Sequence, residues 1–217
     1  MIGDILLIKS FHRRAAERIW KAISNQNLHK RVISISGESG SGKSELAHSL
    51  ARVMNNHGVV TKILHSDNFY NIDPLERTAF RVSKGIAQTV GLQEYDWKAA
   101  YAMIRDFKEN KTSSFPCIDL LTQQTDTQLT DFSPVEVLIF EGLYAIHIDT
   151  PGAIKILIDI TYEETRKAQL LRGKEHLNEV RFQVLQAEHK AVLTIKSEAQ
   201  IIINKKFQVQ LPKMLPI

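Results

Sequence analysis

A glycine-rich run, Gly37–Ser44, stands between a short apolar stretch at 32–35 and a helical pattern that begins near residue 45. A glycine, four further residues and then Gly-Lys-Ser let the backbone curl around a phosphate, with successive N–H groups and a helix N-terminus directed at it. We therefore interpret the run as a phosphate-binding loop between a strand and a helix. The candidate nucleotide ligands are Gly37, Glu38, Ser39, Gly40, Ser41, Gly42, Lys43 and Ser44.

Two side chains of this loop have expected chemical roles. Lys43 supplies a positive charge that can bridge the β- and γ-phosphates of a nucleoside triphosphate, and Ser44 supplies a hydroxyl to Mg²⁺. The alternative, a flexible glycine-serine turn, is disfavoured by the flanking strand and helix patterns. The loop thus predicts nucleotide binding but does not select a reaction.

Composition narrows the class of protein. The 217 residues, 43% hydrophobic and 24% charged, suit one α/β domain with a full core. A single cysteine, Cys117, excludes an internal disulfide, and no apolar run is long enough to span a membrane, so we expect a cytoplasmic protein. The net charge of +4 is spread without an aromatic-interleaved stripe, and the eight histidines show no short ligand spacing. We expect neither nucleic-acid nor membrane partners.

Apolar periodicity predicts alternating strands and helices. Strands are expected at 32–36, 59–64, 135–140, 155–160 and 200–203, and helices at 11–23, 44–56 and 178–192, with Ser10 capping the first and a further helix starting after Asp96. Residues 70–110 are helical and polar, and Thr122–Thr130 is expected to be a polar loop. Such alternation predicts a parallel sheet with the site at the carboxyl ends of its strands.

Two carboxylates follow expected strands and so belong at that edge. Glu141 comes directly after a buried strand and can hold Mg²⁺, with a helix-capping role as the alternative. Asp67 follows the second strand and can accept the proton of a substrate hydroxyl, with a loop or N-cap role as the alternative. The metal ligands that the residues themselves indicate are therefore Ser44 and Glu141.

A signalling GTPase is disfavoured. The run at 149–152 matches Asp-x-x-Gly, but the nearest guanine-reading candidate, at 204–207, lacks its aspartate. Asp-Thr-Pro-Gly is also a good turn sequence in its own right.

At this point the sequence resembles the uridine kinase and phosphoribulokinase family of P-loop kinases. The resemblance spans about residues 31–204. Its motifs occur in family order: the phosphate loop, Ser-Asp-Asn-Phe-Tyr at 66–70, Tyr-Asp-Trp at 95–97, Phe-Pro-Cys-Ile-Asp at 115–119, Leu-Ile-Phe-Glu-Gly-Leu at 138–143 and Ala-Gln-Ile-Ile-Ile at 199–203.

This resemblance implies an α/β P-loop NTPase fold of the nucleotide-kinase type, with a parallel five-stranded sheet flanked by helices, a helical lid and an acceptor-site insertion. It implies ATP and Mg²⁺ as cofactors and a small-molecule hydroxyl as acceptor. Asp67 matches the catalytic base and is an implied Mg²⁺ ligand beside Ser44 and Glu141, with Lys43 as the second catalytic residue. Arg166 and Arg172 are implied cofactor ligands in the lid, and the implied substrate ligands are Tyr70, Arg77, Asp96, Gln123 and Arg181.

The domain boundaries expected are an N-terminal helical extension at 1–30, a kinase domain at 31–204 and a tail at 205–217. Within the kinase domain we expect the acceptor insertion at about 70–130 and the lid at about 163–190. Oligomeric state stays open, a homo-oligomer included.

The acceptor is less defined than the chemistry. Ile118 and Gln123 stand where uridine kinases have tyrosine and histidine in the pyrimidine pocket, and Asp96 suits either ribose hydroxyls or a helix cap. We expect a uridine- or cytidine-like nucleoside. The alternatives are a sugar phosphate bound by Arg77, Arg81 and Lys84, pantothenate, and a nucleotide-binding regulatory protein with reduced catalysis.

Overall fold

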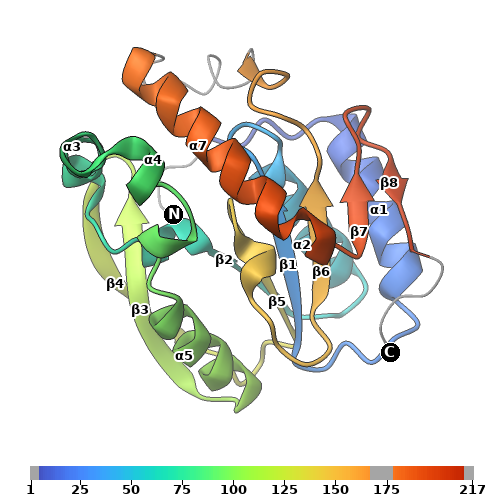
Figure 1. Ribbon diagram of the computed structural model, residues 1–217. Helices are drawn as coiled ribbons and strands as arrows, with labels where there is room; N and C mark the ends of the chain where they lie inside the picture. The colour runs from blue at the N-terminus through green and yellow to red at the C-terminus, as the bar shows by residue number, and fades with distance from the viewer. Residues whose placement is uncertain (1–4, 167–177, 213–217) are drawn as a thin grey trace.

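The computed structural model describes residues 5–166 and 178–212, and its centre is a six-stranded sheet (Figure 1). The strand order is β2-β5-β1-β6-β7-β8; the first five are parallel and β8 pairs antiparallel at the edge. The strands are β1 (Arg31–Gly37), β2 (Thr61–His65), β5 (Val137–Glu141), β6 (Ile154–Ile158), β7 (Ile201–Ile203) and β8 (Val209–Gln210). The predicted five-stranded parallel sheet is confirmed, and β8 is an addition.

Helices cover both faces of this sheet. The α-helices are α1 (Ser10–Ile23), α2 (Lys43–Asn56), α3 (Pro74–Lys84), α4 (Ile86–Thr89), α5 (Trp97–Lys108) and α7 (Glu179–Ile195). Short 3₁₀ helices are η1 (Ser66–Phe69), η2 (Leu92–Glu94), η3 (Ala145–His147) and η4 (Lys196–Glu198). Within the described ranges, none of the helices combines the length and apolar character needed to cross a lipid bilayer.

Successive residues of a strand point to opposite faces, which explains the two-sided burial. On β1, Ile33 and Ile35 pack with α1 and α2, whereas Val32 packs with Phe107 of α5 and its neighbours. Leu157 of β6 meets Val192 of α7 on that second face. Near-continuous apolar strands are the signature of a parallel sheet buried on both sides.

Residues 66–136 form one insertion between β2 and β5, at the left of Figure 1. It holds α3, α4, α5 and a hairpin of β3 (Thr112–Asp119) and β4 (Gln124–Asp131). The prediction of a polar loop at 122–130 is therefore wrong. Nearly all of β4 is exposed, so it shows no apolar alternation; it is a strand because it pairs along the whole of β3, which buries Phe115.

The prediction that Ser10 caps the first helix is also wrong. Ser10 is the first helical residue, and Lys9 occupies the cap position. The backbone N–H of Lys9 donates to Nδ1 of His12 at 2.9 Å. His12, the third helical residue, thus accepts from the N–H of the cap residue, whereas a capping hydroxyl would accept from an N–H of the first turn.

Candidate active site

The phosphate loop joins β1 to α2 as the sequence predicted. Gly42 is the N-cap of α2 and has a left-handed φ of 94°, and it makes no side-chain cap hydrogen bond. A Cβ there would lie 2.8 Å from Nε2 of His12, so glycine is required by both conformation and space. The first turn of α2 accordingly presents its backbone N–H groups and the positive end of the helix dipole, which suits an anion.

Glu141 lies at the end of β5 beside this loop. The register pairs Glu141 with Ile35 of β1 on one side and with His65 of β2 on the other. Its Oε1 accepts from Ser44 Oγ at 2.9 Å and contacts His65 Nδ1 at 2.5 Å. The sheet register therefore brings together a loop hydroxyl, a carboxylate and an imidazole from three separate segments.

Electrostatics keep this carboxylate ionised. Burial by itself would raise the pKa of Glu141, but the His65 ring, the Lys43 ammonium and the Ser44 hydroxyl outweigh burial and lower the pKa to about 2. Lys43 Nζ also donates to the carbonyl of Glu38 at 3.1 Å, within the loop. A charged oxygen next to a hydroxyl oxygen is a ligand pair that Mg²⁺ prefers.

Asp67 reaches the same edge from η1, which follows β2 directly. It is half-buried, and the hydroxyl of Tyr95 donates to its Oδ1 at 3.5 Å. A Cβ on Gly142 would collide with Ser66 Oγ and lie 3.5 Å from Asp67 Oδ1, so the glycine after Glu141 lets η1 approach β5. Lys43, Ser44, Asp67 and Glu141 are thus gathered at the carboxyl ends of β1, β2 and β5.

The oxygen donors of Ser44, Asp67 and Glu141 fit a magnesium ion that has few protein ligands. No group of three or more histidine, cysteine or carboxylate side chains that could hold a metal exists in the part of the chain the structure describes. Mg²⁺ usually takes one or two carboxylates and completes its shell with phosphate oxygens and water, so Ser44, Glu141 and Asp67 suffice. All three side chains offer oxygen atoms, which are the ligands that Mg²⁺ prefers.

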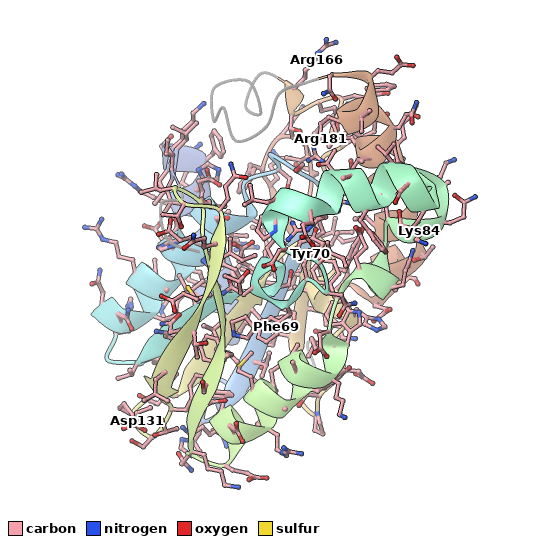
Figure 2. All side chains as sticks on the ribbon, turned by 90° about the vertical axis from the view of Figure 1, so that its left-hand side faces the viewer. Phe69, Tyr70, Lys84, Asp131, Arg166 and Arg181 are labelled. Carbon is pink, nitrogen blue, oxygen red and sulfur yellow. The ribbon has the colours of Figure 1, made fainter. Side chains whose placement is uncertain are left out.

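Three tyrosines extend the site away from the sheet. The rings of Tyr70 and Tyr95 lie 4.2 Å apart, and the ring of Tyr144 meets Tyr95 at 5.5 Å. The guanidinium of Arg77 lies over Tyr70 at 3.5 Å and donates to the carbonyl of Ile72. In Figure 2 Tyr70 lies beside α3, below Arg181.

The other basic residues of the insertion have different surroundings. Arg81 is buried and forms two hydrogen bonds with Glu94, at 2.6 and 3.1 Å, whereas Lys84 is exposed. A cavity of about 220 Å³ lies next to this pair. Its lining residues are Tyr70, Asn71, Ile72, Arg77, Phe80, Gln88, Thr89, Gln93 and Glu94.

Glu38 and Ser39, two of the four residues between Gly37 and Gly42 of the phosphate loop, contact the segments expected to form the lid. Glu38 accepts from the backbone N–H of Tyr162 and contacts Nδ1 of His189 on α7, both at 2.6 Å. Ser39 accepts at its carbonyl from Thr165 Oγ1 and at its hydroxyl from Arg181, at 2.7 and 3.0 Å. The phosphate loop is therefore in direct contact with α7 through His189 and Arg181.

The remaining predicted site residues are divided. Asp96 is exposed and caps α5 by accepting from the N–H of Ala99, so the capping alternative is realised. Gln123 is exposed in the turn of the β3–β4 hairpin, with φ of 57°. Arg166 is exposed, and Arg172 lies outside the described residues. Arg181 donates to the hydroxyl of Ser39 in the phosphate loop.

Some residues of this region were missed from the sequence. His65 immediately precedes a predicted motif, and Tyr144 immediately follows one, so adjacency was the available signal. Glu188 of α7 is 4% exposed and accepts from Arg181 at 2.9 Å. A glutamate in a mostly polar helical stretch gives no local sign that it is buried.

The strand order, the glycine loop and the flanking helices define a P-loop NTPase fold of the nucleotide-kinase type. The model of the phosphoribulokinase / uridine kinase family matches residues 32–162, and the chain belongs to this family. Family membership supports an ATP-dependent kinase with a small-molecule acceptor, and such kinases generally use ATP and Mg²⁺.

Individual relatives are distant. The uridine kinase of Ureaplasma urealyticum is 26% identical over 154 residues, which cover 68% of this chain and 70% of that protein. A bifunctional alpha-galactosidase/sucrose kinase of Mediterraneibacter gnavus is 25% identical over 204 residues, covering 88% of this chain and 22% of that protein. The phosphoribulokinase of Rhodobacter spheroides has the same fold, with a TM-score of 0.61 and 18% identity over 82% of this chain and 71% of its own.

Proposed function

We propose that this chain transfers the γ-phosphate of ATP to a hydroxyl of a neutral small molecule, with a uridine- or cytidine-like nucleoside as the first candidate. The observation that carries the proposal is the meeting of Ser44, Glu141 and Asp67 beside the phosphate loop. A nucleotide-binding loop alone is common to many activities, but two acidic side chains at its edge suit phosphoryl transfer.

Each of these residues has a proposed role. The loop N–H groups and Lys43 bind the phosphates, while Ser44 and Glu141 would hold Mg²⁺, assisted by Asp67. When bound, the ion neutralises charge on the phosphates. Asp67 accepts the proton of the attacking hydroxyl, so that catalysis consists mainly of alignment and electrostatic stabilisation.

The contacts of the basic residues favour a neutral acceptor. Arg81 is neutralised by Glu94, and Lys84 is exposed. Arg77 lies over the ring of Tyr70 at 3.5 Å, and Arg81 lies 5.9 Å from the same ring. One guanidinium that already donates to a backbone carbonyl is weak support for a sugar-phosphate site.

A neutral sugar is the second candidate. The match to the sucrose kinase relative covers more of this chain than the uridine kinase match does, 88% against 68%. The exposed Gln123 also gives no support for reading a pyrimidine base.

The test is ADP release from ATP and Mg²⁺ in the presence of uridine, cytidine, sucrose, ribose 5-phosphate or pantothenate. We expect release to depend on a neutral acceptor, and Asp67→Asn to lower turnover by about 10² to 10⁴-fold while ATP binding is retained, because the proton acceptor is lost. Asp126→Asn, an exposed change in the hairpin, is the matched control.

Two results would contradict the proposal. Wild-type turnover in Asp67→Asn would require another base. ADP release that does not respond to any acceptor would instead favour a nucleotide-binding regulatory protein.

A further inference from the structure

Two buried polar atoms near the tyrosines have no hydrogen-bond partner among the residues the structure describes: Oε2 of Glu188 and the hydroxyl of Tyr144. Glu188 is 4% exposed and Tyr144 is fully buried. Buried side-chain polar atoms are nearly always hydrogen-bonded, so such exceptions indicate groups that a ligand completes.

Both atoms belong to one cluster that begins at Asp67. The hydroxyl of Tyr95 contacts Asp67, and the ring of Tyr95 packs against Tyr144. Burial raises the pKa of Tyr144, and the nearby charge of Glu188 raises it further. Burial also raises the pKa of Tyr70, and the charges of Asp67 and Glu188 raise it further. Val192, one turn along α7 from Glu188, packs in the same cluster as Tyr95 and Tyr144, so α7 brings Glu188 to the tyrosines that Asp67 reaches from η1.

The cluster also leads back to the phosphate loop. Arg181 donates to Oε1 of Glu188 through one nitrogen and to Ser39 Oγ through another, at 2.9 and 3.0 Å. Glu188 is thus tied to the phosphate loop through Arg181, and Tyr144 is tied to the proposed base through Tyr95. An acceptor whose hydroxyl reaches Asp67 therefore lies next to these tyrosines.

The charges define what the unpartnered pair can bind. A carboxylate repels a phosphate or carboxylate group, which excludes an anionic ligand. Arg181 forms an ion pair with Glu188, and the Glu188 charge also raises the pKa of Arg81. These two guanidinium groups disfavour a cationic ligand. A neutral hydroxyl satisfies both atoms, because it can donate to Oε2 and accept from the tyrosine, which remains a protonated donor.

We propose that Glu188 and Tyr144 bind a second hydroxyl of the acceptor and so select a neutral molecule with at least two hydroxyl groups. This inference rests on the proposed function, since the first hydroxyl is the one phosphorylated beside Asp67. The pair determines specificity and takes no part in bond making.

The experiment compares wild type with Glu188→Gln and Tyr144→Phe, using uridine, 2′-deoxyuridine, 3′-deoxyuridine and sucrose as acceptors in the ADP-release assay. We expect each variant to raise the KM for the neutral acceptor at least about tenfold, with the KM for ATP changed less than about twofold. Wild type should discriminate against one deoxy analogue, and the variants should lose that discrimination, an effect that general loosening of the fold would not produce.

Matched controls remove the same groups elsewhere. Glu179→Gln removes an exposed carboxylate from α7, and Tyr101→Phe removes a surface hydroxyl from α5. Both should behave as wild type.

Calorimetric titration of uridine and of sucrose, with ADP and Mg²⁺ present, separates this inference from the proposed function. Binding that weakens in both variants supports the inference even if no phosphate is transferred, in which case the proposed function fails alone. Turnover with unchanged acceptor KM and unchanged discrimination in both variants overturns the inference alone. Failure of wild type to bind either polyol overturns the inference too.

Discussion

At the scale of single residues, the most informative contact is the meeting of His65 and Ser44 on one oxygen of Glu141. The three side chains come from β2, α2 and β5, and no local interaction aligns them. Their alignment follows from strand register, in which His65 lies opposite Glu141. The lowered pKa of Glu141 therefore depends on contacts that exist only in the folded chain.

Glu141 should give a distinctive acid sensitivity. Its folded pKa of about 2 lies below the ordinary value of 4.5, so its ionised form stabilises the fold above pH 4.5, and that contribution is lost as the pH falls from 4.5 towards 2. Urea denaturation across this range should show wild type losing its stability advantage over Glu141→Gln. An advantage that stays constant on acidification would contradict this assignment, and the surface variant Glu17→Gln should show no such trend.

The site residues that could be predicted from the sequence are those that directly follow a strand. The glycine loop, Asp67 and Glu141 could be found because each follows a strand directly, and parallel strands end at one edge. Glu188 and Tyr144 could not be found in this way. Their burial depends on how α7 packs over the sheet and the insertion, which is decided by contacts between segments far apart in the chain.

At the scale of elements, the insertion is held together by a polar contact inside it. Arg81 of α3 reaches Glu94 of η2, and both side chains are less than 10% exposed. The sequence offered α3 either as an anion-binding surface or as a solvated helix face. The helix divides these roles, because Arg81 points inward and Lys84 faces solvent.

Removal of one partner of this buried ion pair should be costly. Arg81→Met leaves the Glu94 carboxylate buried without its counter-charge, and the free energy of unfolding should fall by about 3–5 kcal/mol. Adding Glu94→Gln should recover part of that loss, since no unpaired charge then remains. Urea denaturation of both variants measures the effect.

Lys84→Met, on the same helix, is the control and should change stability by no more than about 0.5 kcal/mol. Equal stability of Arg81→Met and Lys84→Met would show that the pair does not hold the insertion.

The hairpin shows why one element escaped prediction. Strand β4 has the composition of a loop, and its pairing with β3 supplies what its own side chains do not. Propensity in strands depends on neighbours more than it does in helices, and α2, α5 and α7 could be predicted from patterns within and beside their own segments.

At the scale of the whole molecule, α1 shares a hydrophobic cluster with the sheet and the phosphate-loop helix. Ala15, Ile19 and Ile23 of α1 pack in one cluster with Leu46 and Leu50 of α2. The N-terminal helix therefore supports the face of the sheet opposite to the insertion, on the side where α2 begins its phosphate contacts.

Ile19→Ala should reveal this support. Ile19 is fully buried, so truncation leaves a cavity and should lower the free energy of unfolding by about 2–5 kcal/mol. Arg18→Ala, one position away and exposed, should have an effect within about 0.5 kcal/mol. Thermal or urea unfolding distinguishes the two, and an Ile19→Ala protein as stable as wild type would mean that α1 is not part of the structural core.

The placement of the insertion between two paired strands has a consequence for how such a chain can diversify. Because β2 and β5 are hydrogen-bonded parallel neighbours, the sheet fixes both ends of the 66–136 segment, which leaves β2 at the carboxyl edge of the sheet and enters β5 at the amino edge. The entropy of closing a loop grows only with the logarithm of its length, so lengthening or replacing this segment costs the sheet little. New acceptor pockets can therefore arise by exchange of one continuous stretch of chain, while the phosphate loop on the neighbouring strand keeps its geometry.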